Sequence, residues 1–121
     1  MIQVGSLLNV VDNSGAKKAC CIKILEGSSK KKYGEIGDLI LVVVKTLRLN
    51  KAKVKVKKGE IIKGLIVRSK FFKNDIRFQE NSVVLLNKQF KTIGTRVFGP
   101  VLKSFRFTKF LRIALISSEL L

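Results

Sequence analysis

The sequence has no histidine or tryptophan, one proline and only two cysteines among its 121 residues. Without histidine, it lacks the side chain that most often acts as a base near neutral pH or binds a metal ion. The cysteines, Cys20 and Cys21, are adjacent, whereas a structural disulfide normally joins distant segments. We therefore predict no catalytic residue, no metal site and no cofactor. We also expect two reduced cysteines, one in the core and one near the surface.

Long apolar runs are also missing. The longest, Leu39–Val44, is far shorter than the roughly 20 residues that a membrane span requires. The N-terminus shows neither a basic region followed by a long apolar stretch nor an Arg- and Ser-rich amphipathic presequence. The basic clusters fall in predicted loops and strands and not on an amphipathic helix. We therefore expect neither a membrane partner nor an import address.

Acidic residues are scarce. The chain has 8 Asp and Glu and 25 Lys and Arg, which gives a net charge of +17. Three of the lysines, Lys30, Lys31 and Lys32, are consecutive, and five more fall between Lys51 and Lys58. Such clusters repel one another unless a polyanion neutralises them. A merely solubilising surface would mix in acids. The charge pattern predicts a polyanion partner, and a hydrophobic content of 46% predicts a packed core.

Short apolar runs separated by turn residues indicate a mainly β protein, either a small closed barrel or a sandwich. The first run ends in the turn Asp12-Asn13-Ser14-Gly15, whose residues favour tight turns. The next segment, Lys17–Leu25, predicts a strand with Lys23 facing outward. The remaining predicted strands include Leu39–Val44, Ile61–Val67 and Ser82–Leu86. No linker or repeat divides the chain, which predicts one domain over residues 1–121.

From Lys45 to Lys58 the pattern changes to alternation, in which Lys51, Lys53, Lys55 and Lys57 interleave with small apolar residues. In an extended chain these lysines would line one face at intervals of about 6.6 Å. Together with the run that follows, the pattern predicts a projecting basic β-hairpin that contacts a polyanion. After Gly99-Pro100, apolar residues recur at spacings of three and four, which predicts a short helical C-terminal region docked on the sheet. We expect most phenylalanines in that region to be core residues.

Five segments carry a family resemblance: LNVVDNSGA at Leu8–Ala16, GEIGD at Gly34–Asp38, KVKKGEII at Lys55–Ile62, IGTRVFGPV at Ile93–Val101, and a partial signature from Gly64 to Leu85. In this order, and essentially from Met1 to Leu121, the chain resembles the large-subunit ribosomal protein L-fourteen family. Two departures from the family pattern stand out. The loop Ser69–Asp75 is abbreviated, and the hairpin tip Leu47–Lys53 is slightly longer and lacks the usual proline.

The resemblance implies a five-stranded β-barrel that is a structural constituent of the large ribosomal subunit. It implies binding to large-subunit rRNA near the subunit interface and contacts with neighbouring large-subunit ribosomal proteins. It further implies a bridge to the small-subunit rRNA and, in many systems, a ribosome-silencing factor as a partner. Thr95, Arg96 and Arg112 match the edge that makes the interface contacts. Asn13, Ser14, Lys17 and Lys18 match a loop expected near RNA.

From the resemblance and from the positions of the cations, we predict two sets of site residues. Lysine attracts phosphate from many directions, and arginine forms forked bonds to phosphate oxygens. The predicted RNA-binding residues are Asn13, Ser14, Lys17, Lys18, Lys23, Lys30, Lys31, Lys32, Arg48, Lys51, Lys53, Lys55, Lys57, Lys58, Arg68, Lys70 and Arg77. The predicted subunit-interface and protein contacts are Thr95, Arg96, Arg106, Lys109 and Arg112.

Two other functions compete with this interpretation. A free-standing single-stranded nucleic-acid-binding barrel would need exposed aromatic side chains for base stacking, such as Tyr33, Phe71 and Phe72. An enzyme would need a base to activate Ser14 or the cysteines, and the sequence offers no histidine for this.

Composition also bears on location. The chain is rich in Lys, Ile, Phe and Asn, whose codons are AT-rich. This composition indicates an AT-rich genome, and the lack of an import address agrees with an organelle-encoded chain. The departures at the two loops favour a mitochondrial ribosome, with a bacterial cytoplasm or a plastid as alternatives.

Overall fold

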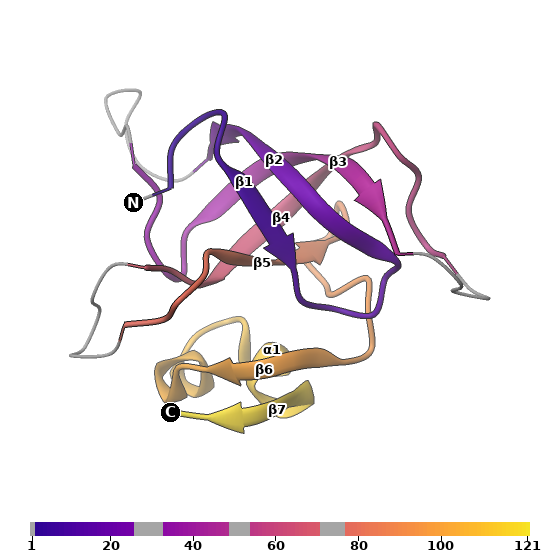
Figure 1. Cartoon of the computed structure of the whole chain (residues 1–121). Coiled ribbons are helices and arrows are strands. Elements are labelled where there is room, and N and C mark those ends of the chain that lie inside the picture. Colours follow the sequence, from indigo (N-terminus) through magenta and orange to yellow (C-terminus); the bar gives the residue numbers. More distant parts are fainter. Residues whose placement is uncertain (1, 26–32, 49–53, 71–76) are drawn as a thin grey trace.

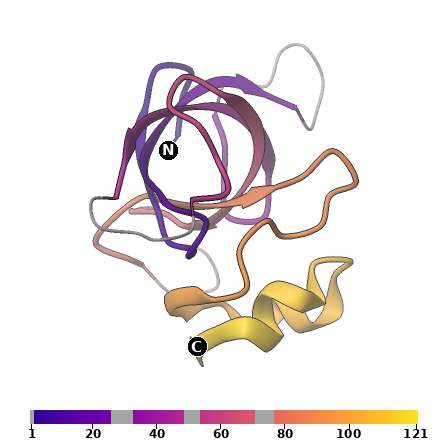
Figure 2. The same ribbon diagram turned by 90° about the vertical axis from the view of Figure 1, so that its right-hand side faces the viewer.

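Five strands form a closed barrel in the computed structural model, which describes residues 2–25, 33–48, 54–70 and 77–121. The strands follow the chain in the order β1–β2–β3–β4–β5, and each pairs antiparallel with the next. The barrel closes where β1 pairs parallel to β5, so that Asn9 lies opposite Ser82 and Val10 opposite Val83 (Figures 1 and 2). The bounds are β1 Leu7–Val10, β2 Ala16–Ile24, β3 Leu39–Leu47, β4 Ile61–Arg68 and β5 Ser82–Leu86. The predicted five-stranded barrel is confirmed.

The strands form from runs of β-branched and aliphatic residues, which suit a pleated surface that is buried on at least one face. In β3 the buried residues Ile40, Val42 and Val44 alternate with less buried neighbours, as expected for a wall with one interior face. All five residues of β5 are buried. A strand buried on both faces needs cover on each, and the C-terminal segment lies beside β5 (Figure 1).

A C-terminal layer packs beside the barrel and consists of β6 Val97–Val101, the 3-10 helix η1 Lys103–Phe107, the helix α1 Leu111–Ile116 and β7 Ser117–Leu120. The two strands pair in parallel, so the two short helices form the crossover between them (Figure 1). The predicted short helices are confirmed. The sequence pattern did not predict the two-stranded sheet, because its strands have only four or five residues, and Gly99 and Pro100 interrupt the periodicity of β6.

The predicted basic hairpin differs from expectation in its described part. Residues 54–60 form no strand, although Val56 is buried and its neighbours Lys55 and Lys57 are exposed. The Lys55 amide donates to the Ser14 carbonyl at 2.8 Å and the Gly59 amide to that of Val44 at 2.8 Å. Residues 54–60, which we call the returning arm, therefore lie against the β1–β2 turn and the end of β3. They do not form one strand of a free ribbon. Lys51 and Lys53 lie outside the described residues.

Candidate nucleic-acid interface

The segments Leu8–Ala16 and Ile93–Val101 meet in space through Asn13. Its Oδ1 accepts hydrogen bonds from the backbone amides of Thr95 at 2.7 Å and Arg96 at 3.2 Å, and its Nδ2 donates to Thr95 Oγ1 at 2.8 Å. Gly94 permits this approach, since a Cβ there would lie 2.6 Å from Asn13 Oδ1. Asn13, which was predicted to bind RNA, thus holds the loop that presents Thr95 and Arg96.

The buried carboxylate of Asp12 stabilises the same turn. It is fully buried and accepts three hydrogen bonds, from the Ser14 hydroxyl at 2.5 Å, the Ser14 amide at 3.1 Å and the Leu85 amide at 3.1 Å. Burial raises the pKa of Asp12 above its usual value, and the bonds from Ser14 and Leu85 oppose that rise. Because Ser14 is itself fully buried and bonded to Asp12, its side chain acts within the turn and is not presented to RNA.

Two cations bind backbone carbonyls around this turn. Lys55 is exposed and donates from Nζ to the Ile93 carbonyl at 3.2 Å, which joins the returning arm to the Thr95 loop. Arg48 donates to the Val10 carbonyl at 2.9 Å, and its guanidinium lies 5.8 Å from the centre of the Phe98 ring. Both residues were predicted to bind RNA. In the structure they also connect the barrel to the loops around the interface.

Arg68 connects the barrel to the C-terminal layer. It is only 8% exposed, donates to the Phe98 carbonyl at 2.6 Å and pairs with Glu80 at 3.1 Å. Burial lowers the pKa of its guanidinium, and Glu80 partly restores it. A side chain so enclosed cannot reach a phosphate, so we leave Arg68 out of the interface proposed below. The sequence could not reveal this, because a lone arginine after an apolar run is equally typical of a surface cation.

The other predicted RNA-binding cations that the structure describes reach the surface. Lys18 is half-buried, and the exposed members are Lys17, Lys23, Lys57, Lys58, Lys70 and Arg77. Lys70 and Arg77 lie together, since Arg77 Nε donates to the Lys70 carbonyl at 2.8 Å. Lys30, Lys31 and Lys32 lie outside the described residues.

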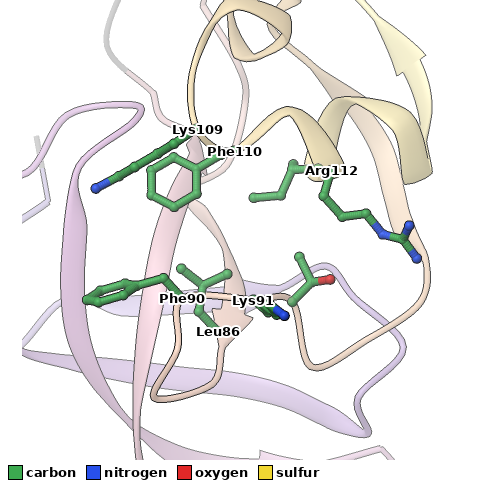
Figure 3. Close-up of a pocket in the computed structure, with 8 residues that line it drawn as sticks. Leu86, Phe90, Lys91, Lys109, Phe110 and Arg112 are labelled. Carbon is green, nitrogen blue, oxygen red and sulfur yellow. The ribbon is translucent and has the colours of Figure 1, made fainter.

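All five residues of the predicted subunit-interface set are exposed. Thr95 and Arg96 come from the loop before β6, and Arg106, Lys109 and Arg112 from the helical crossover. Lys109 and Arg112 border a cavity of about 410 Å³ between the β5–β6 loop and that crossover (Figure 3). The other labelled lining residues are Leu86, Phe90, Lys91 and Phe110.

No sequence pattern predicted this cavity. Phe90 and Lys91 sit in a short loop where no periodicity marks them, and Lys63 faces Phe90 only after β4 and β5 pair. The expectation that most C-terminal phenylalanines are core residues holds for Phe105 and Phe110. Phe107 is the exception, since it is 88% exposed.

The cysteines behave as predicted, since Cys21 is buried, Cys20 is half-buried and both are free thiols. Burial raises the pKa of the Cys21 thiol. Among the described residues, no three His, Cys, Asp or Glu side chains gather closely enough to hold a metal ion. Over the same ranges, no helix has the length and hydrophobicity needed to cross a membrane.

A closed barrel whose outer loops carry exposed lysines and arginines defines a small basic β-barrel protein of the kind that binds polyanions. Within that class the chain belongs to the family described as Ribosomal protein L14p/L23e, whose model matches residues 1–121. Members of this family are structural proteins of the large ribosomal subunit and not enzymes. The chain is therefore a ribosomal protein that serves translation, and its family membership implies binding to rRNA and to other ribosomal proteins.

Proposed function

We propose that this protein binds large-subunit rRNA through exposed cations around the Asp12–Ala16 turn, along β2 and on the returning arm. The supporting observation is the junction at Asn13 and Lys55, which fixes the Thr95 loop to the turn and to the arm. Lys17 follows the turn directly, and Lys57 and Lys58 follow Lys55 on the arm; all three are exposed.

The mechanism is electrostatic clamping on a stiff support. A helical RNA has a major groove too deep and narrow for side chains and a shallow minor groove, so recognition depends on shape and backbone. Lysines tolerate many phosphate orientations, whereas Arg77 and Arg96 can form forked bonds to phosphate oxygens. Strands and backbone-bonded loops hold the cations in place, which lowers the entropy lost on binding.

Salt dependence tests the proposal. With about six phosphate contacts, the plot of log affinity against log salt should have a slope of about −4 to −5 for an rRNA fragment. The substitution Lys57→Glu should weaken binding and make the slope shallower by about 1. Lys103→Glu makes the same charge change on the C-terminal layer and serves as the control. A slope near zero for the unmodified protein would contradict the electrostatic mechanism.

We further propose that Thr95, Arg96, Arg106, Lys109 and Arg112 face the small subunit, contribute to a bridge with its rRNA and offer a docking edge to a ribosome-silencing factor. Their exposure and their position on two adjoining segments support this. Large subunits that carry Arg96→Glu should assemble normally but join small subunits less completely in a sucrose gradient. Normal joining would count against the bridge. Reduced joining with Lys103→Glu would show a general effect of charge.

We place the protein in a mitochondrial ribosome, with a bacterial or plastid ribosome as the alternatives. The support is compositional, since the chain has 8 phenylalanines but one proline and no tryptophan, as an AT-rich genome favours. Sedimentation of the chain with ribosomes from isolated mitochondria is the direct test. The family match disfavours the alternative of a free-standing single-stranded nucleic-acid-binding barrel. Of the aromatic residues that such a barrel would use for base stacking, Tyr33 is exposed, and Phe71 and Phe72 lie outside the described residues.

A further inference from the structure

Phe90 adopts a backbone conformation that its side chain disfavours. Its φ is +63°, and within the described ranges it is the one non-glycine residue with a positive φ. A bulky aromatic residue is uncommon there, because its Cβ crowds the neighbouring carbonyl. Such strain persists only when surrounding bonds hold it, and it concentrates at functional positions. The conformation of Phe90 therefore needs an explanation beyond chain reversal, which glycine or asparagine would serve better.

The turn that holds Phe90 is bonded on every side. The Phe90 amide donates to the Asn87 carbonyl at 3.0 Å, and the Asn87 amide donates to the Lys91 carbonyl at 2.8 Å. The Asn87 side-chain oxygen accepts from the amides of Gln89 at 2.9 Å and Lys91 at 3.0 Å. These bonds fix the direction in which the Phe90 ring leaves the turn. The ring is 41% exposed, so packing in the core does not account for it.

The Phe90 ring borders the cavity of about 410 Å³ described above, and the Phe110 ring borders it from the helical crossover (Figure 3). Lys109 Nζ lies 5.7 Å from the centre of the Phe90 ring and 5.3 Å from that of Phe110. Lys63 Nζ lies 4.1 Å from the centre of the Phe90 ring. Lys91 and Arg112 also line the cavity, and none of its lining residues is acidic. The cavity lining thus combines the exposed Phe90 and the buried Phe110 with three cations, and Lys63 of β4 lies against the Phe90 ring.

We propose that this cavity binds one unstacked nucleotide of RNA, with the base against the exposed Phe90 ring and its phosphates held by Lys91, Lys109 and Arg112. The inference rests on the proposed function, since RNA is the polyanion that the rest of the surface binds. Aromatic rings stack on bases regardless of sequence, and cations beside them hold the backbone. The cavity also falls within the size range of small-ligand sites.

The aromatic and cationic lining favours a nucleotide over a protein segment. An apolar side chain of a protein partner would bind as favourably to leucine as to phenylalanine at position 90. A base gains from the flat ring, and its phosphates use the cations, which an uncharged segment would leave without a counterion. A strained turn that fixes the orientation of one ring is consistent with a stacking platform, because stacking depends on ring orientation.

Binding of a labelled hexauridylate to the full chain, followed by fluorescence anisotropy at low salt, tests the proposal. Phe90→Tyr should retain binding, and Phe90→Leu should weaken it about 5- to 150-fold, as expected for the loss of one stacked base. Phe107→Leu removes an exposed ring outside the cavity and should have little effect. Equal affinity for all variants would overturn the proposal. So would wild-type affinity in Phe90→Leu with loss only in Phe90→Gly, because that pattern indicates apolar docking.

Two further measurements distinguish the loss of base stacking from a loss of charge attraction and from a loss of stability. Inorganic polyphosphate carries charge without bases, so its affinity should be the same for the wild type and for Phe90→Leu; an equal loss for both probes would overturn the stacking role. Phe90→Gly suits the positive φ, so its melting temperature should equal or exceed that of the wild type. If a structured rRNA fragment still binds with steep salt dependence while the Phe90 variants match the wild type, only this inference fails. If the wild type binds no RNA, the proposed function fails.

Discussion

Asp12 shows how one buried polar residue organises the interface. Its carboxylate accepts hydrogen bonds from Ser14 and Leu85, and so ties the turn after β1 to β5. The adjacent Asn13 then holds the amides of Thr95 and Arg96. Because a buried carboxylate without partners would be costly, these hydrogen bonds stabilise the turn. The exposed cations nearby depend on this arrangement for their positions.

The pH dependence of stability should reveal Asp12. Burial raises its pKa in the folded state, so the folded protein binds this proton more tightly than the unfolded chain does. The contribution of Asp12 to stability is therefore largest in acid. It falls as pH rises from the unfolded pKa, about 4, through the raised folded value. Urea denaturation of the wild type and of Asp12→Asn, measured across this pH range, checks the prediction.

The difference in stability between the two proteins isolates the effect from the other carboxyl groups. The stability of the wild type relative to Asp12→Asn should decrease with increasing pH, because asparagine does not ionise. A difference that is constant with pH, or that moves in favour of the wild type, would show that the hydrogen bonds outweigh burial at this carboxylate.

At the scale of elements, β6 is the strand that joins the two layers. Its residue Phe98 donates from the amide to the Val11 carbonyl at 2.7 Å and accepts from Arg68 at 2.6 Å. Gly99 has a φ of +81°, and a Cβ there would lie 2.8 Å from Arg68 Nη1. A side chain at position 99 would therefore be strained by the positive φ and would displace the Arg68 guanidinium.

Gly99→Ala should lower the free energy of unfolding by about 1–3 kcal/mol through backbone strain, and further through displacement of Arg68. It should also speed amide exchange at Phe98. Gly59→Ala is the matched control, because Gly59 has a φ of +85° and nothing within 4 Å of its added Cβ. Equal losses in the two variants, measured by urea denaturation, would mean that contact with Arg68 contributes nothing.

At the scale of the whole molecule, the net charge of +17 lies on 7306 Å² of accessible surface. Folding brings these charges together, so self-repulsion lowers the stability of the isolated protein. Raising NaCl from about 50 to about 500 mM should increase the melting temperature, because screening lengths shorten over this range. Polyphosphate should increase it further at low salt by binding the folded state. A melting temperature that falls with NaCl would show that native ion pairs outweigh the repulsion.

Much of the architecture could be predicted from the sequence. Short apolar runs and turn residues predicted a closed barrel or a sandwich, and the family resemblance supplied its five strands. The C-terminal spacing predicted the helices. The β6–β7 sheet was missed, because its pairing joins residues far apart in the chain and neither strand shows a clear alternation. The lysine alternation of the returning arm indicated an extended ribbon. Hydrogen bonds with Ser14 and Val44 instead draw this segment against the barrel.

Composition and local pattern by themselves determined that this chain folds around strands and attracts polyanions, since charge and apolar periodicity are properties of residue order. Only the tertiary structure decided which cations are available to bind. It buried Arg68 beneath β6, joined Asn13 to the Thr95 loop, and placed Lys63 and Lys109 beside Phe90. The physical reason is that burial and hydrogen bonding depend on neighbours brought together by strand pairing, and no local stretch of sequence specifies them.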